Sequence, residues 1–311
     1  MRTSKTWVLS KRRTGRIVFD MNDFDETIAE TFATSYFQTM RQMGQEPILT
    51  AARHQIHRLK KVQAVSAALQ QAGRAQPFDL LKKYTEPSRS DVRFREVPSV
   101  LWRIEGQKRQ EILKSLPVYR ALLAPDRLHL FTFFRPLDVA FKIVGTGSVA
   151  LRDYVVLMEG NGPGDPLFLQ IKQEVNSAYT RYLLAQPWAH QGQRVVDGQR
   201  RVQPISDLLL GWTRIGQGDF LVRQLNDHKG SVDLSRLQGA GLATLAALAG
   251  ELLARGHARS RDALAIASYA GSGDKIIRAI THYGRIYAEW TTEDFHAFKG
   301  AVANGRFKAV A

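Results

Sequence analysis

Cysteine is absent from all 311 positions of the chain. Without thiols the protein forms no disulfide, uses no thiolate nucleophile and holds no zinc or iron–sulfur cluster through cysteine ligands. A chain of this kind fits a reducing compartment, so we expect a cytoplasmic protein.

Long apolar runs are lacking as well. No segment reaches the roughly 18 consecutive apolar residues that a membrane-spanning helix needs, and the apolar part of residues 1–13 is too short for a signal peptide. The histidines form no H-E-x-x-H metal motif, and no serine occupies a nucleophile elbow. We therefore expect a soluble protein with no membrane partner and with neither zinc-protease nor serine-hydrolase chemistry.

The chain has fewer acidic than basic residues. The chain has 44 Lys and Arg against 29 Asp and Glu, a formal charge of +15, and residues 51–150 alone hold 18 against 8. A basic segment of this size attracts polyanions such as nucleotides, nucleic acid or an acidic surface, although a solvated basic face has the same composition. With 44% hydrophobic residues, the chain can build one large or two ordinary domains.

The most informative stretch is a glycine loop followed by a predicted β-hairpin. The apolar runs Tyr154–Met158 and Leu167–Ile171 flank a Gly-Asn-Gly-Pro-Gly turn, which favours two paired strands. Gly145 and Gly147 precede the hairpin, and glycines let backbone N–H groups approach a ligand closely. Lys172 ends the second strand, where its ammonium group can neutralise phosphate charge. The pattern indicates either a phosphate-binding loop with its lysine or a tight turn with a surface lysine.

An acidic run stands near the N-terminus. Asp20, Asp23, Asp25 and Glu26 place four carboxylates within seven residues, and they repel one another unless a cation lies among them. Clustered carboxylate oxygens suit Mg²⁺. An acidic N-terminal cap of the following helix has the same composition, so both interpretations stay open.

Hydrophobic periodicity predicts that most of the remaining chain is helical. The predicted helices cover 27–43, 48–72, 79–84, 106–125, 126–142, about 12 residues after Lys172, 193–212, 234–256, 262–270, 273–288 and a last segment capped at Thr292. Residues 219–225 are predicted to form a strand. The helix over 234–256 is rich in Ala and Gly, which predicts close packing against a neighbour.

Several segments stand out as motifs. They are Phe19–Glu26, Val144–Val149, Pro166–Lys172, Gly192–Arg200, Ser206–Thr213, Val222–Ser231 and Ala254–Ser260. In this order, and over nearly the whole length, they resemble the bacterial family catalogued as domain of unknown function 2252. That family is itself similar to protein-kinase-like and aminoglycoside-phosphotransferase-like folds.

The resemblance implies a nucleotide site that uses ATP and Mg²⁺ as cofactors. Its nucleotide-binding residues would be Gly145, Thr146, Gly147, Ser148, Lys172 and Asp197. The loop would cover the phosphates, Lys172 would contact them, and Asp197 would be the acidic partner on the adjacent helix. Asp23 would hold the metal, with Asp25 supporting it. Other residues of the family motifs are Asp20, Arg223, Asp227, Lys229, His257 and Arg259.

The chain departs from the family pattern in ways that bear on activity. The metal motif precedes the glycine loop, so the order of parts is permuted relative to ordinary kinases. Family members carry a Gly-Asp-x-His-x-x-Asn stretch before that motif, whereas residues 6–13 stand there instead. The catalytic base therefore has no counterpart, and the catalytic residues are unknown. Ala150 replaces the third loop glycine, and Asp197 replaces a glutamate. We expect a truncated or diverged member, or one whose true start lies upstream of Met1.

These observations predict an α+β, mostly helical fold of the protein-kinase-like type. Residues 1–142 would supply the metal motif and a basic helical part of a large lobe, 143–232 a small antiparallel-sheet lobe, and 233–311 the rest of the large lobe. The expected function is nucleotide binding, with impaired or absent phosphoryl transfer to an unidentified small molecule. The alternative is a non-enzymatic module that binds polyanions or nucleic acid through the basic helices at 51–150.

Overall fold

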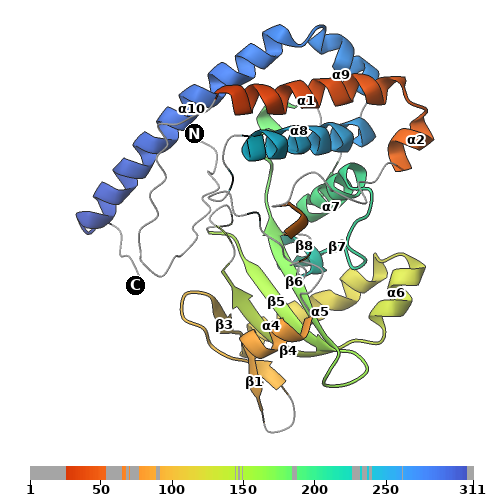
Figure 1. The fold of residues 1–311 in the computed structure, drawn as a ribbon. Coiled ribbons are helices and arrows are strands. Elements are labelled where there is room, and N and C mark those ends of the chain that lie inside the picture. Colours follow the sequence, from red (N-terminus) through yellow and green to blue (C-terminus); the bar gives the residue numbers. More distant parts are fainter. Residues whose placement is uncertain are drawn as a thin grey trace. The chain divides into compact units, whose positions relative to one another are not determined.

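The structure is a computed structural model that describes residues 26–53, 65–67, 70, 77–88, 92–143, 145, 148, 150–183, 188–225, 232, 237, 240–260 and 262–306 (Figure 1). The chain divides into two compact units. Of the described residues, a sheet unit holds 70–200 and 205–225, and a helical unit holds 26–67, 201–204 and 232–306. The fold class is α+β, as the sequence predicts.

A six-stranded antiparallel sheet, in the order β3-β4-β5-β6-β8-β7, is the centre of the sheet unit. Its strands are β3 (Leu101–Arg103), β4 (Arg135–Lys142), β5 (Asp153–Glu159), β6 (Pro166–Glu174), β7 (Gly211–Ile215) and β8 (Gly218–Gln224). The hairpin predicted over 154–171 is confirmed, because β5 pairs with β6 and Tyr154 lies opposite Ile171. Every residue of β5 is buried, which explains its unbroken apolar run. A separate two-stranded sheet pairs β1 (Thr85–Pro87) with β2 (Val92–Phe94).

The sheet starts earlier in the chain than the predicted position near 143. Residues 135–142, predicted as helix, form β4. Pro136 cannot donate a helical hydrogen bond, and β4 instead bonds to β3 and β5 on its two sides. The helix predicted over 193–212 ends at Val202, and its last two predicted residues, Gly211 and Trp212, begin β7. The helix predicted after Lys172 is wrong too, because β6 runs on to Glu174 and residues 175–183 form no helix except the short 3₁₀ turn η2 (Thr180–Tyr182).

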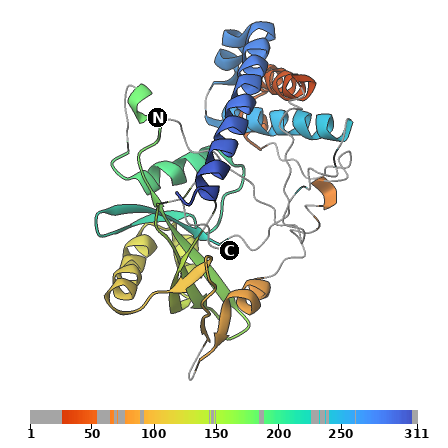
Figure 2. The same cartoon turned by 90° about the vertical axis from the view of Figure 1, so that its left-hand side faces the viewer.

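The two faces of the sheet are covered by different elements. Helices α5 (Gly106–Ala121) and α6 (Pro125–Phe131) cover one face, where Tyr119 and Ile112 pack on residues such as Ile171. On the other face, Tyr84 of α4 (Pro77–Tyr84) and Phe94 of β2 pack against an apolar patch of β4, β5 and β6. Helix α7 (Gln191–Val202) covers β7 and β8, with Val196 against Leu221 (Figure 2). The remaining part of this second face is polar.

The helical unit contains α1 (Glu26–Gln45), α2 (Ile48–Arg53), α8 (Ala240–Ser260), α9 (Ala263–Ala270) and α10 (Asp274–Ala303). The predicted close packing of the Ala- and Gly-rich helix is confirmed where α8 meets α1. A Cβ atom on Gly250 would lie 2.2 Å from the Phe32 carbonyl oxygen, and the Ser35 hydroxyl donates to the Ala247 carbonyl at 2.6 Å. Met40 and Ala254 complete this contact and are fully buried.

One continuous helix, α10, replaces the two that the sequence predicts from 273 onward. The predicted cap at Thr292 does not form, because the Thr291 and Thr292 hydroxyls donate to the carbonyls of Tyr287 and Ala288, four residues back. Such bonds keep a threonine inside a helix instead of ending it. Neither α10 nor any other helix in the described ranges carries a stretch long and apolar enough to cross a membrane.

Candidate functional site

The glycine loop joins β4 to β5, two neighbouring strands of the sheet (Figure 1). At its start, the Ile143 N–H donates to the Val100 carbonyl at 2.9 Å. Within it, the Ser148 N–H donates to the Gly145 carbonyl at 2.9 Å and the Leu151 N–H donates to the Ser148 carbonyl at 3.0 Å. Thr146 and Gly147 lie outside the described residues. The loop ends at Arg152, which exchanges two hydrogen bonds with Gln173 of β6.

Lys172 stands beside the end of this loop. It lies opposite Asp153 in the β5–β6 ladder, and its side chain is 27% exposed. Its Nζ is 3.6 Å from Glu174 Oε1, a loose contact beyond ordinary hydrogen-bond length. Burial raises the pKa of Glu174, whereas the positive charges of Lys172 and of Arg194 on α7 act to lower it. The ammonium group is therefore near solvent and only loosely held.

Asp197, the predicted acidic partner of Lys172, is engaged elsewhere in this structure. Its carboxylate accepts a hydrogen bond from the Trp188 indole N–H at 2.8 Å. The carboxylate that lies next to the Lys172 ammonium is Glu174, on the same strand. From α7 it is Arg194 that reaches back to this region, donating to the Val175 carbonyl at 3.1 Å. A direct pair between Lys172 and Asp197 stays a prediction.

A buried polar group lies on the same face as Lys172, and the sequence analysis missed two of its three members, Asp153 and Gln170. Gln170 donates through Nε2 to both carboxylate oxygens of Asp153, at 3.0 and 2.8 Å. Its Oε1 accepts from Arg223 Nε at 2.9 Å. Asp153 and Gln170 are each only 1% exposed. The three side chains come from β5, β6 and β8, so only strand register brings them together. The signal in the sequence was Gln170, a polar residue inside an otherwise apolar strand, which indicates a buried polar contact.

The electrostatics of this group favour an anion. Burial raises the pKa of Asp153 to about 6, and this rise is opposed by the Gln170 hydrogen bond and by the charges of Lys172, Lys142 and Arg223. Three cations therefore lie within electrostatic range of one buried carboxyl group. With Glu174 and Asp153 both ionised, the five charges still sum to a positive value, which attracts phosphate oxygens.

Ala150, at the place of the third loop glycine, has a φ of +69°. This left-handed conformation costs an L-residue about 1–2 kcal/mol, and glycine adopts it without that cost. We therefore expect Ala150→Gly to stabilise the protein by roughly 0.5–1 kcal/mol in urea unfolding. Ala249→Gly, at an exposed position inside α8, is the matched control and should lose about 1 kcal/mol. Destabilisation by both variants would contradict the expected strain.

Other predicted site residues lie elsewhere or outside the described ranges. Asp20, Asp23, Asp25, Asp227 and Lys229 fall outside them, so the metal motif stays a prediction. His257 and Arg259 lie on α8 in the helical unit, where the Tyr36 hydroxyl and His257 Nδ1 are 2.8 Å apart. Burial and the neighbouring Arg255 lower the pKa of Arg259. Within the described ranges, no three His, Cys, Asp or Glu side chains form a group suited to a metal ion.

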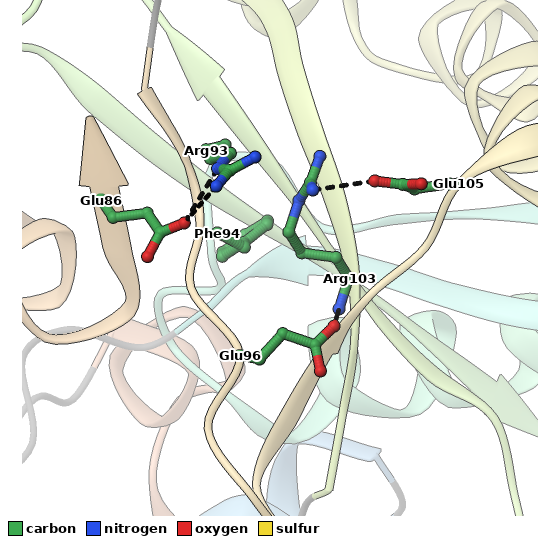
Figure 3. A pocket seen from close by; sticks show the side chains of 6 residues that line it. All are labelled: Glu86, Arg93, Phe94, Glu96, Arg103 and Glu105. Carbon is green, nitrogen blue, oxygen red and sulfur yellow. Dashed lines mark hydrogen bonds and ion pairs between the residues drawn. The ribbon is translucent and has the colours of Figure 1, made fainter. Parts of the chain in front are cut away.

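A pocket of about 350 Å³ opens between β2 and β3 on the sheet unit (Figure 3). Ion pairs join Arg93 to Glu86 and Arg103 to Glu105, each at 2.8 Å. The buried Asp138 accepts from Arg103 Nε at 3.0 Å and from the Phe94 N–H at 2.9 Å. The lining residues are Glu86, Arg93, Phe94, Glu96, Arg103 and Glu105. Because both arginines of the lining are already held in ion pairs, the pocket is a structural network rather than the best candidate site.

Comparison with known protein families places most of the chain in one of them. The model of a protein family described as "Uncharacterized protein conserved in bacteria (DUF2252)" covers residues 27–301. No curated protein and no solved structure matches the chain. The matched range takes in the glycine loop, α7 and the strands β5, β6 and β8, which carry Asp153, Gln170, Lys172 and Arg223. The chain therefore belongs to DUF2252, a family of uncharacterised bacterial proteins.

Proposed function

We propose that the protein binds a nucleoside triphosphate, with Mg²⁺, at the glycine loop and Lys172 of the sheet unit. The observation that carries this proposal is the anchoring of the loop end beside Lys172, through the hydrogen bonds between Arg152 and Gln173. A glycine loop between two strands and a lysine on the next strand is the arrangement that kinases use for ATP phosphates. Mg²⁺ would neutralise phosphate charge, and the ligands predicted for it from the sequence, Asp23 and Asp25, lie outside the described residues.

Phosphoryl transfer to a small molecule is the finer part of the proposal. No residue of this sequence matches the family's catalytic-loop motif, and a positioned general base contributes about 10²- to 10⁴-fold to a rate. We propose that any transfer is slow while nucleotide affinity is retained, because binding depends on the loop and the cations and not on the base.

Lys172→Ala tests the binding proposal. A charged hydrogen bond to phosphate contributes about 1.5–3 kcal/mol, so titration calorimetry with ATP and Mg²⁺ should show about a 10- to 100-fold weaker affinity. Lys114→Ala, which removes an exposed lysine of α5 on the opposite side of the sheet, should bind like the unmodified protein. Absence of ATP binding, or equal binding by both variants, would rule the proposal out.

The alternative proposal is a polyanion-binding module built on the basic segment at 51–150. Part of that charge is neutralised locally, since Arg93, Arg103, Lys108, Arg127 and Arg135 each pair with a carboxylate. A polyanion-binding module should lose affinity for duplex DNA linearly with the logarithm of salt concentration, with a slope set by the number of phosphates neutralised. Measurable, steeply salt-dependent binding of DNA that survives Lys172→Ala would favour this alternative.

A further inference from the structure

Two further cations lie on the same face of the sheet as Lys172. We infer that Lys142, Lys172 and Arg223 together hold the phosphate chain of the nucleotide, and that Asp153 takes up a proton when the phosphates bind. This inference rests on the proposed function and deepens it, because it names the residues that recognise the phosphates and makes their occupancy depend on pH.

Strand register places the three cations on one face. Ala140 pairs with Val155, and Val155 pairs with Gln170, so these residues point to the same side. Lys142 is two residues beyond Ala140 and Lys172 two beyond Gln170, which keeps both on that side. Arg223 lies directly opposite Gln170. Since β4 and β8 are three strand spacings apart, the cations extend over roughly 14 Å, which suits a chain of phosphates better than one.

Among the described residues, none of the three cations has a partner in a tight ion pair. The Lys142 ammonium contacts the Ile143 carbonyl at 3.1 Å and lies 5.6 Å from the centre of the Tyr84 ring. Arg223 donates to the neutral Gln170 amide. Lys172 has only the loose 3.6 Å contact with Glu174. Their positive charge is therefore available to an anion without first breaking a strong pair.

Asp153 competes with that anion for the same cations. Facing it are Lys142 from β4, Lys172 from β6 with Glu174 beyond it, and Arg223 from β8. The three cations hold its pKa, which burial raises to about 6, below the value that burial alone would give. Bound phosphates neutralise the cations and add negative charge, so the pKa of Asp153 rises further. Near pH 7 the carboxylate then takes up to one proton from solvent for each nucleotide bound, and affinity increases as the pH falls from 8 to 6.

Proton uptake can be counted directly. We would titrate the full chain with ATP and Mg²⁺ at pH 7 in two buffers of different ionisation enthalpy, which gives the number of protons bound per nucleotide. The unmodified protein should take up more protons than Asp153→Asn, by up to one. The variant should also bind severalfold more tightly at pH 8 and lose most of its pH dependence between 6 and 8. Asp126→Asn, on the surface of α6, should behave like the unmodified protein.

Lys142→Ala keeps the inference testable if Asp153→Asn folds poorly. This variant should weaken the binding of ATP and of inorganic triphosphate, both by severalfold, because the cations contact phosphates and not the base. This inference is overturned, while the proposed function stands, if Lys172→Ala weakens ATP binding but Lys142→Ala does not and Asp153→Asn leaves the proton uptake unchanged. If ATP does not bind at all, both fall.

Discussion

Gly192→Ala is expected to destabilise the sheet unit by roughly 2–4 kcal/mol, because the added methyl group has no space. A Cβ atom at this position would lie 2.3 Å from the carbonyl oxygen and 2.6 Å from the carbonyl carbon of Phe220. Phe220 belongs to β8 and its ring is fully buried. Backbone atoms of a paired strand cannot turn away as a flexible side chain can, so the first turn of α7 must shift.

Gly198→Ala is the matched control on the same helix. Apart from its own helix backbone, no described atom lies within 4 Å of a Cβ at position 198, and replacing glycine by alanine inside a helix gains about 0.5–1 kcal/mol. Urea unfolding of the two variants should therefore give shifts of opposite sign. Equal shifts, or a stabilising Gly192→Ala, would mean that α7 does not approach β8 as closely as described.

The close approach at Gly192 also bears on the candidate site. Arg194, two residues further along α7, reaches the Val175 carbonyl next to the end of β6 and opposes the raised pKa of Glu174. Glu174 in turn is the carboxylate beside Lys172. Displacing the start of α7 would move this arginine, so a nucleotide titration of Gly192→Ala should show weaker binding than one of Gly198→Ala.

The elements of the fold that could be predicted are those determined by residues close together in the sequence. The hairpin over 154–171 was predictable because two apolar runs flank a glycine-rich turn, and both signals lie within 20 residues of each other. Strand β4 was not, since its residues alternate poorly in polarity and its identity comes from pairing with β3 and β5. The break predicted at Thr292 was wrong because a threonine can cap one helix or bond backward within another, and the sequence is the same in both cases.

The candidate site shows the same limit. Lys172 was a candidate from the sequence because it follows the apolar run 167–171 of the predicted hairpin. Asp153 and Arg223 are 70 residues apart, and each is bonded to Gln170 only because β6 lies between β5 and β8. Spacing along the chain carries no information about such a contact. Asp197 is the opposite case. Its motif position was evident from the sequence, but its hydrogen bond to Trp188 was not.

Gly250→Ala is the second change with a large expected effect, and it acts on the helical unit. A Cβ here would lie 2.2 Å from the Phe32 carbonyl oxygen and 3.1 Å from the Tyr36 backbone nitrogen, both on α1. The two helices must separate to admit it, which opens the contact between Met40 and Ala254. We expect a loss of roughly 2–4 kcal/mol. Gly300→Ala on α10, with no atom within 4 Å of the added Cβ, should be neutral or slightly stabilising.

Hydrogen exchange distinguishes a local effect of Gly250→Ala from a global one. Separation of α1 from α8 should also lengthen the 2.8 Å contact between the Tyr36 hydroxyl and His257, so amides of both helices should exchange faster. Amides of β5 and β6 draw their protection from pairing within the sheet, and under native conditions they should keep it. If α1 and α8 kept full protection in this variant, the helices would have to accommodate a methyl group at their crossing, and the close packing described for Gly250 would be wrong.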